Sequence, residues 1–504
     1  MRGLRIGPAV RRWLVAAALL LLPIALYHDT IAAHYGLRDD YSILRESREE
    51  PGKVLQWCAS QGRPLYGLVL EASFARLNGI GDLRAGRSLS ALAVGIVSWL
   101  AYFALRRARW AEAPSLAFAA LLAVLPAAQV DVSWAVCFPH VLAAVAGLGG
   151  FLLAEAGGWP RRAGGAALVA CGALFYQPHA LLYLVPVAAG LVARRREPIA
   201  ARARWLAPHL VTVAAGLGLA FAVVSGLFAA GIVEPSRLWA FDVDPWAKLL
   251  WFADQPLHNA LAMIVLRDDT RGLSPAYWAM AAGVGVAILV ALLGELRRHG
   301  LRSAGFFAIC VTAIALGSFA ANLIASERTP KYRTLWALTA VCAVFAVQGL
   351  ETLADRLPRI GRWLAPAALA AVALAGAPLA RSQAYTLFAL PQGQELALVE
   401  QSVQSALLRG ESAVFVIRPA PEDTLAPLHF EDEFGSLSSD SDWVPLEMLK
   451  AVIAERAPSL CDARRPCRIA TGRVVPPGSR YDLVIDMRRL HGLRAHGDAY
   501  ARRG

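Results

Sequence analysis

The segment GRPLYGLVLEASFARLNGIGDLRAGRSLSALAVGIVSWLAYFALRR, residues 62–107, contains two different kinds of helix. Residues 65–77 are only half apolar, and Glu71 and Arg76 make them too polar to cross a bilayer. A helix of this composition lies in the membrane interface. Residues 86–105 form an apolar run that is long enough to cross about 30 Å of hydrocarbon. The segment therefore predicts an interfacial helix followed directly by a membrane span.

Apolar runs of this kind recur along most of the chain. Of its 504 residues, 57% are hydrophobic and 17% are charged, whereas a soluble protein carries about 25% charged residues. The alternating segments of about ten residues that form a membrane barrel are absent from the sequence. We predict a polytopic α-helical membrane protein with about eleven transmembrane helices. Their approximate positions are 13–33, 86–105, 113–131, 139–157, 163–177, 179–193, 205–231, 276–294, 303–325, 332–350 and 361–380.

Arginines in alternate loops predict the orientation of these spans. With eleven spans, the arginine-rich loops fall on the side of the N-terminus, which the positive-inside rule places in the cytoplasm. The net charge of +12 therefore reflects membrane topology and does not indicate nucleic-acid binding. Residues 163–193 have arginines at both ends, which predicts two short spans that turn at Tyr176-Gln177-Pro178-His179. The first span is expected to remain as an uncleaved anchor rather than act as a signal peptide.

The opposite side carries the long polar segments. We expect a transmembrane domain over residues 1–380, with outer loops at 34–85 and 232–275, and a soluble domain over 381–504. The pattern predicts helices at 383–409 and 444–456 and strands at 412–417 and 481–487, which suits a small α/β unit. The acidic segment 431–442 is expected to be a solvated loop.

Cys461 and Cys467 lie close together in this polar tail. In an oxidising compartment, this spacing predicts a small disulfide loop. Cys137, Cys171, Cys310 and Cys342 lie in or beside spans and are interpreted as small apolar residues.

Asp39 and Asp40 follow the first span directly. Adjacent residues do not share one face of a helix or strand, so the two carboxylates are expected to have different roles. Low dielectric near the bilayer raises the pKa of a carboxylate, which suits it to abstract a proton. The alternative is an ordinary solvated loop.

Three cations, Arg328, Lys331 and Arg333, follow Glu327 at an outer membrane edge, where the positive-inside rule predicts few of them. Guanidinium groups bind phosphate oxygens in a bidentate manner, and lysine adds a point charge. The group predicts a phosphate-binding site. The alternative is anchoring to anionic lipid head groups.

Tyr176, Gln177 and His179 occupy the outer tip of the predicted short hairpin. Polar groups at such a position tend to face a cavity, where they can bind a sugar hydroxyl or a phosphate. The alternative is that they cap helix ends.

The sequence has no phosphate-binding loop, no dinucleotide fingerprint and no His, Cys and Asp spacing that is typical of a zinc site. No cofactor is predicted with certainty, although a divalent metal remains open. Its candidate ligands are Asp131, Asp242, Asp244, Asp268 and Asp269.

The order of features in the first outer region resembles a known family. A first span, an acidic pair, Pro64-Leu65-Tyr66, Phe74-Ala75-Arg76-Leu77 and a span that ends in two arginines follow one another. This order is similar to that in the C-type glycosyltransferase superfamily, which uses polyprenyl-phosphate sugars. Protein O-mannosyltransferases, the aminoarabinose transferase of lipid A and O-antigen glucosyltransferases are relatives, and the last group is nearest in motif.

The resemblance implies a GT-C-like fold in a bacterial inner membrane, with the C-terminal domain in the periplasm. It implies an inverting glycosyltransferase that moves a sugar from a polyprenyl-phosphate carrier to an envelope glycan, glycolipid or protein. Asp39 or Asp40 would be the base, and Arg63 and Glu327 would join the substrate site. A second acidic metal motif of the family has no evident counterpart. The alternatives are a non-catalytic scaffold of envelope assembly and a flippase for a lipid-linked glycan.

Overall fold

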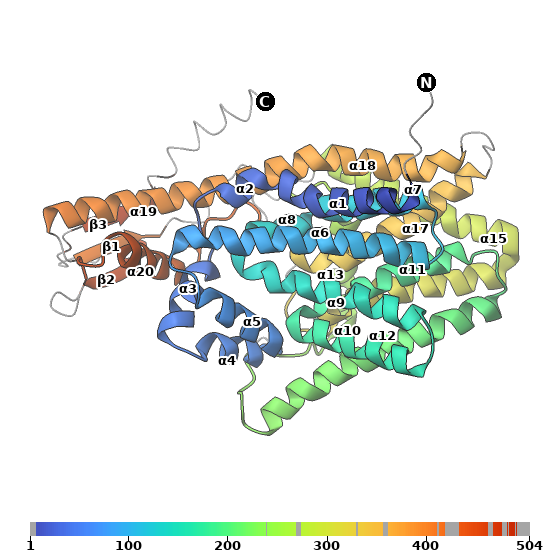
Figure 1. Ribbon diagram of the computed structural model, residues 1–504, viewed down its shortest axis with the longest axis horizontal. Coiled ribbons are helices and arrows are strands. Elements are labelled where there is room, and N and C mark those ends of the chain that lie inside the picture. The colour runs from blue at the N-terminus through green and yellow to red at the C-terminus, as the bar shows by residue number, and fades with distance from the viewer. Residues whose placement is uncertain are drawn as a thin grey trace.

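The computed structural model describes residues 7–237, 239–268, 274–328, 331–355, 361–410, 413–418, 433–461, 467–475, 481, 483–488 and 490. Long helices lie roughly parallel to the long axis of the molecule, and a small sheet with its own helices lies at one end (Figure 1). One large apolar core runs through the helices of the bundle.

The bundle consists of apolar helices that match most of the predicted spans. Seven helical runs in the described part of the chain are long and apolar enough to cross a membrane, and a bent pair, α7–α8, makes eight. The predicted number of eleven spans is not tested by this count. Two of the runs are longer than one span and reverse direction, so each contains more than one predicted span. The helices of the bundle are α1 (Pro8–Leu26), α6 (Leu83–Arg107), α7 (Glu112–Val124), α8 (Pro126–Ser133), α9 (Phe138–Glu155), α10 (Trp159–Ala180), α11 (Leu184–Ala193), α12 (Ile199–Ala229), α15 (Pro275–Ser318), α17 (Trp336–Ala354) and α18 (Gly361–Ala384).

The run Trp159–Ala193 is a hairpin. Tyr176 has extended backbone angles, φ −161° and ψ 106°, and interrupts α10. Arg162, near the start of α10, lines a small pocket together with Glu155, and Arg194, just beyond α11, lies 3.4 Å from the Glu155 carboxylate. Both ends of the run therefore lie at the same end of the bundle, as the arginines in the sequence predict.

The run Pro275–Ser318 also reverses direction. Gly300 breaks α15 with φ +78°, a backbone conformation that favours glycine. Tyr277, near its start, donates a hydrogen bond to Asn259, and Phe319, just beyond its end, stacks near Phe252. Both residues thus contact the segment that contains α13 (Pro245–Asp254) and α14 (Pro256–Leu261). The two arms correspond to the spans predicted at 276–294 and 303–325.

The first polar segment folds into short helices beside the bundle. It contains α2 (His28–Ala32), α3 (Asp39–Glu49), α4 (Lys53–Ser60) and α5 (Pro64–Phe74). Pro64 lies in the first turn of α5, where its missing N–H costs no intrahelical hydrogen bond. The half-apolar helix predicted for residues 65–77 is therefore present as α5, three residues shorter at its C-terminal end.

The C-terminal region is joined to the bundle by an almost continuous helix. α18 passes through a π-helical turn (Tyr385–Ala389) into α19 (Leu390–Arg409), so the predicted domain boundary at residue 380 lies inside helical structure. Strands β1 (Ala413–Ile417), β2 (Arg468–Gly472) and β3 (Leu483–Asp486) form a parallel sheet in the order β2-β1-β3, flanked by α20 (Val444–Arg456). The sequence pattern missed β2, which follows the disulfide between Cys461 and Cys467.

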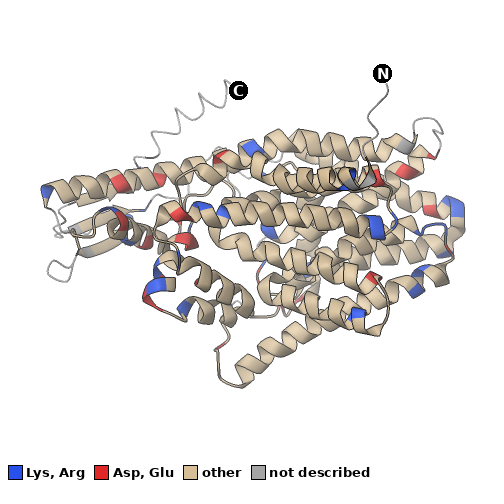
Figure 2. Ribbon diagram, viewed as in Figure 1, with Lys and Arg blue, Asp and Glu red and all other residues tan. Residues whose placement is uncertain are grey.

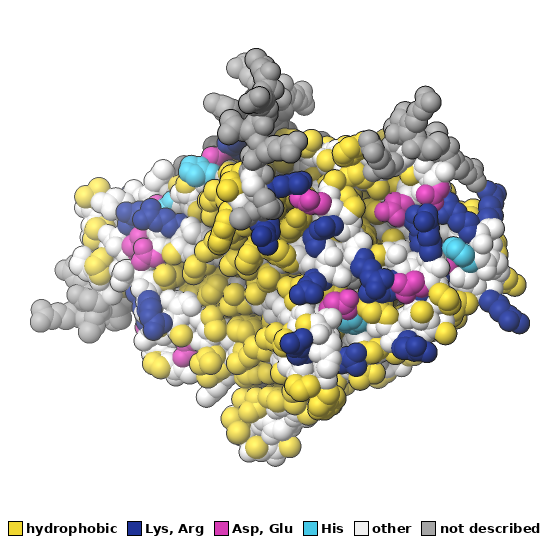
Figure 3. Space-filling model, turned by 45° about the vertical axis from the view of Figure 1, so that its right-hand side comes forward, with side chains coloured by type: hydrophobic (Ala, Val, Ile, Leu, Met, Phe, Trp, Pro, Cys, Tyr) yellow, Lys and Arg dark blue, Asp and Glu magenta, His cyan; other side chains and the backbone are white. Residues whose placement is uncertain are grey.

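The two ends of the bundle differ in charge. Basic residues gather at the end that lies away from the sheet (Figure 2). Arg195, Arg196, Arg297 and Arg298 line a pocket there. Figure 3 shows basic side chains over this part of the surface, next to a broad area of hydrophobic side chains. We call it the arginine end, and we call the opposite end, which carries α3–α5 and the sheet, the loop end.

Candidate functional site

A cavity of about 610 Å³ lies at the loop end between the α10 break, α12 and the segment before α17. One side of it is apolar and the other is polar and cationic. Its polar lining includes six side chains that the sequence analysis selected, and these are Arg63, Tyr176, Gln177, Glu327, Lys331 and Arg333. The structure therefore brings together residues from three separate parts of the chain.

The apolar wall comes mainly from α12 and the short helix α16 (Ala320–Ile324). Leu217, Phe221 and Val224 of α12 and Ile324 of α16 line the cavity. α12 is also a candidate span with only 28% of its most apolar part buried inside the protein, and Phe221 is 51% exposed. The helix that supplies much of this wall therefore also contributes to the exposed hydrophobic surface of the bundle.

The cationic end is formed by Arg63, Lys331 and Arg333. The Arg63 guanidinium lies over the Tyr176 ring, 5.0 Å from its centroid, and the Arg333 guanidinium lies over the Trp134 ring at the same distance. Aromatic rings hold a guanidinium by its face and leave its edges free to donate hydrogen bonds. This arrangement suits a phosphate group.

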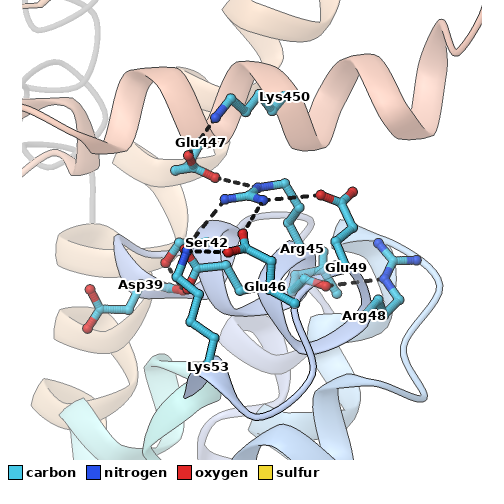
Figure 4. Close-up of polar contacts among 11 residues, drawn as sticks. Asp39, Ser42, Arg45, Glu46, Arg48, Glu49, Lys53, Glu447 and Lys450 are labelled. Atoms are coloured by element: carbon cyan, nitrogen blue, oxygen red, sulfur yellow. Dashed lines mark hydrogen bonds and ion pairs between the residues drawn. The ribbon is translucent and has the colours of Figure 1, made fainter. Parts of the chain in front are cut away.

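Asp39 begins α3 and is half-buried. Within the described ranges, no hydrogen bond or ion pair reaches its carboxylate. Figure 4 shows Asp39 pointing away from the ion pairs that Arg45 forms with Glu447 and its neighbours. Burial raises the pKa of Asp39, and the nearby charges of Arg333, Arg38 and Lys331 lower it in part. Asp39 is thus a carboxylate of raised pKa that does not line the cavity but interacts electrostatically with two of its cations, Arg333 and Lys331.

Asp40 has a different role, as the alternation of adjacent side chains predicts. Its side chain is fully buried and accepts hydrogen bonds from the backbone N–H of Leu37 at 2.9 Å and of Val136 at 3.0 Å. Burial raises the pKa of Asp40 to about 7. Asp40 therefore joins the first polar segment to the turn before α9 and has no access to a substrate.

Two other selected residues do not line the cavity. Arg328 forms a bidentate ion pair with Asp242 at 2.9 and 3.0 Å, and its hydrogen bonds lower the pKa of Asp242 to about 2. His179 is fully buried, and its Nε2 lies 2.7 Å from Oδ2 of Asp131. Arg328 thus connects its own segment to Asp242 of the second outer segment. His179 is packed between helices and contacts Asp131.

Glu433 is not among the predicted site residues. The acidic composition of residues 431–442 predicts a solvated loop, but Glu433 is 1% exposed and its carboxylate lies 3.3 Å from the Arg333 guanidinium. Ser436 and Ser438, also buried, accept hydrogen bonds from Arg38. The acidic composition gave no signal for this contact, because the partner cations are remote in the sequence.

Trp239 belongs to the second outer segment, residues 232–275. Its ring lies against Gly62, at a position that leaves no room for a side chain there, and it lines the cavity. Trp239 therefore contributes directly to the cavity.

The predicted metal candidates separate in the structure. Asp244 caps α13, and Asp242 pairs with Arg328, while Asp269 lies outside the described residues. Among the described residues, one group offers three ligand atoms within 4.8 Å of one another, and it consists of Asp131, Cys137 and His140.

Comparisons with known proteins gave few matches. No protein-family model and no curated protein matches the chain. The chain is similar to the oligosaccharyltransferase of Archaeoglobus fulgidus, crystallised with Zn and sulfate, with 13% identity, a TM-score of 0.42 and coverage of 92% of this chain and 62% of that one. It is also similar to ArnT from Cupriavidus metallidurans bound to undecaprenyl phosphate, with 13% identity, a TM-score of 0.38 and coverage of 92% and 90%. The chain thus spans less than two thirds of the oligosaccharyltransferase, and we infer its function from its own residues.

Proposed function

We propose that the protein is a membrane glycosyltransferase that takes a sugar from a polyprenyl-phosphate carrier and transfers it to a hydroxyl acceptor. The observation that carries this proposal is the shape and charge of the cavity at the loop end. Apolar side chains of α12 and α16 line this cavity together with three cations, Arg63, Lys331 and Arg333. A polyprenyl phosphate has the same two parts, a long hydrocarbon chain and an anionic head.

The cations have a defined role in such a reaction. Arg63, Lys331 and Arg333 would bind the phosphate of the donor and stabilise the charge that grows on it as it leaves. The phosphoester to the carrier already activates the sugar, so no nucleotide is required.

Asp39 would act as the general base. Its carboxylate takes the proton of the acceptor hydroxyl, the oxygen attacks the anomeric carbon, and the bond from that carbon to the phosphate oxygen breaks. Polyprenyl phosphate leaves, and the configuration of the anomeric carbon inverts. Asp39 suits this role because it is half-buried, is unpaired among the described residues and has a raised pKa.

The loop end would face the periplasm of a bacterial inner membrane. The arginine-rich opposite end supports this orientation through the positive-inside rule. The acceptor would be an envelope glycan, a glycolipid or a protein. Reporter fusions at residue 52, between α3 and α4, test the orientation, and cytoplasmic activity of such a fusion would overturn it.

Binding of the donor head can be measured on the purified full chain. Undecaprenyl phosphate is expected to raise the melting temperature in detergent, whereas undecaprenol, which lacks the phosphate, is expected to have little effect. Arg333→Gln should weaken the effect by about tenfold in ligand concentration. Arg328→Gln is the matched control, because Arg328 faces Asp242 rather than the cavity. Equal responses to both lipids would contradict the proposal.

Catalysis can be tested in cells. A strain that lacks the protein and a strain that carries Asp39→Asn should lose the same sugar from the cell envelope. A scaffold would tolerate Asp39→Asn. A flippase would tolerate it too, because transport needs no base, and its lipid-linked substrate would accumulate only in the strain that lacks the protein. An unchanged envelope in the Asp39→Asn strain would exclude the assigned base.

A further inference from the structure

A compact group of metal-ligand side chains lies next to the cavity, where His140 contacts the lining residue Tyr176. We propose that Asp131, Cys137 and His140 bind a zinc ion, which fixes the floor of the cavity. The proposal rests on the positions, burial and missing hydrogen bonds of these residues. It stands independently of the transfer reaction proposed above.

The three residues come from one break in the bundle. Asp131 lies on α8, Trp134 has extended backbone angles, Cys137 ends a 3₁₀ turn (Ala135–Cys137), and His140 lies in the first turn of α9. The extended residue turns the chain so that a side chain before the break and two after it point to one place. Cys137 and His140 are three positions apart and therefore share a face of the new helix. This turn explains why the linear spacing does not look like a zinc motif.

The group has buried polar atoms without hydrogen bonds. Asp131 and Cys137 are fully buried, and His140 is 2% exposed. Oδ1 of Asp131 and both ring nitrogens of His140 have no hydrogen-bond partner in the part of the chain that the structure describes. Buried polar atoms in proteins are nearly always satisfied, and an ion between the two side chains would supply a partner for Oδ1 of Asp131 and for one ring nitrogen of His140.

The distances suit a tetrahedral ion after a small contraction. Oδ1 of Asp131 lies 3.9 Å from Nδ1 of His140, and the three ligand atoms lie within 4.8 Å of one another. Zinc binds oxygen, nitrogen and sulfur at about 2.0–2.3 Å, so its ligand atoms lie roughly 3.3–3.8 Å apart. The contraction is well within the movement of side chains.

Ligand type and charge favour zinc. A thiolate, an imidazole and a carboxylate together are typical of zinc, whereas magnesium and calcium prefer oxygen ligands. One thiolate and one carboxylate neutralise a divalent ion, which removes the cost of an isolated charge in an apolar interior. The hydrogen bond between His179 and Oδ2 of Asp131 supplies the outer partner that orients a metal-bound carboxylate.

The ion would act on the cavity through His140. The His140 ring stacks between Tyr66 of α5, at 4.8 Å, and Tyr176, at 3.9 Å between centroids. Tyr176 lines the cavity and carries Arg63 on its other face. A metal bond to His140 would thus hold the two stacked rings in place. Through them it would position Tyr66 of α5, Tyr176 at the break in α10, and the Arg63 guanidinium that lies over Tyr176.

Metal content tests the proposal directly. The full chain is purified in detergent without chelator, and its zinc is measured by mass spectrometry. After removal of the metal, cobalt is added, because a cobalt–thiolate bond gives a near-ultraviolet absorption band that histidine and carboxylate ligands do not give. We expect close to one zinc per chain and a thiolate band that saturates at one cobalt per chain. A wild-type protein with neither would overturn the proposal, whatever the variants do.

Two variants assign the site. Cys137→Ala should abolish the cobalt–thiolate band, and Asp131→Asn should weaken cobalt binding at least tenfold. Cys342→Ala is the matched control, because Cys342 is buried in α17 outside the group. Its band should equal that of the wild type. A band that persists in Cys137→Ala, or that disappears in Cys342→Ala, would place the metal elsewhere and contradict the assignment. If Cys137→Ala does not fold, Cys137→Ser gives the same reading.

Discussion

The guanidinium of Arg333 lies 3.3 Å from the carboxylate of Glu433. Arg333 lines the cavity at the loop end, and Glu433 belongs to the C-terminal region beyond α19. The contact is buried, since Glu433 is 1% exposed. The C-terminal region thus places an acidic group where the proposed donor phosphate would bind.

Glu433→Gln should therefore strengthen the binding of undecaprenyl phosphate. In the wild type, the lipid phosphate must displace the Glu433 carboxylate from Arg333. Glutamine carries no charge, so this competition is lost and the affinity for the lipid should increase roughly threefold to tenfold. The shift of melting temperature with lipid concentration measures it. Glu447→Gln is the control, since Glu447 pairs with Arg45. Weaker binding in Glu433→Gln would show that Glu433 supports the site instead of competing in it.

The pH dependence of sugar transfer should report Asp39. The base works in its ionised form, and its pKa is raised, so the rate should fall as pH drops through this raised pKa. Arg333 is the first of the neighbouring charges that lower the pKa of Asp39, so Arg333→Gln should move the acid side of the profile to higher pH. The lipid is kept saturating, so that the loss of binding does not obscure the shift. Arg328→Gln should leave the profile in place, and a shift in the opposite direction would contradict the role of Asp39.

Substitution of the two neighbouring aspartates should have different effects on stability, because Asp40 accepts backbone hydrogen bonds and Asp39 is assigned to catalysis. Asp40→Asn replaces one acceptor oxygen by an NH₂ group that faces a backbone N–H, which costs about 1–3 kcal/mol. Asp39→Asn removes no hydrogen bond in the described structure and should change the melting temperature little. Thermal unfolding in detergent compares the two variants. Equal destabilisation would mean that Asp39 also has a structural role.

Gly62 and Gly52 form a matched pair for testing the cavity entrance. Both have positive φ, +81° and +87°, so alanine strains the backbone at each by about 1 kcal/mol. An added Cβ at Gly62 meets the Trp239 ring, whereas at Gly52 it meets nothing within 4 Å. Gly62→Ala should therefore weaken lipid binding, and Gly52→Ala should not. The same lipid-dependent melting measurement applies, and equal lipid responses would remove Trp239 from the binding site.

Much of the fold could be predicted from apolar length and arginine position. Spans, the helix α5 and the hairpin through Tyr176 follow from local rules, because a bilayer requires about twenty apolar residues per helix and disfavours arginine on one side. The helical turn that places Asp39 and Asp40 on different sides is also local. The strand β2 was missed because Arg468–Gly472 is short and has little apolar alternation.

The composition of the site depended on contacts between distant segments. The sequence determined which residues are cations, carboxylates and membrane helices, because composition and periodicity are properties of neighbouring residues. Only the tertiary structure decided that Arg328 faces Asp242 while Arg333 faces the cavity, and that Glu433 joins them from the C-terminal region. It also decided that Asp131, Cys137 and His140 meet, since an extended residue at Trp134 redirects the chain and no pattern of spacing reports that angle.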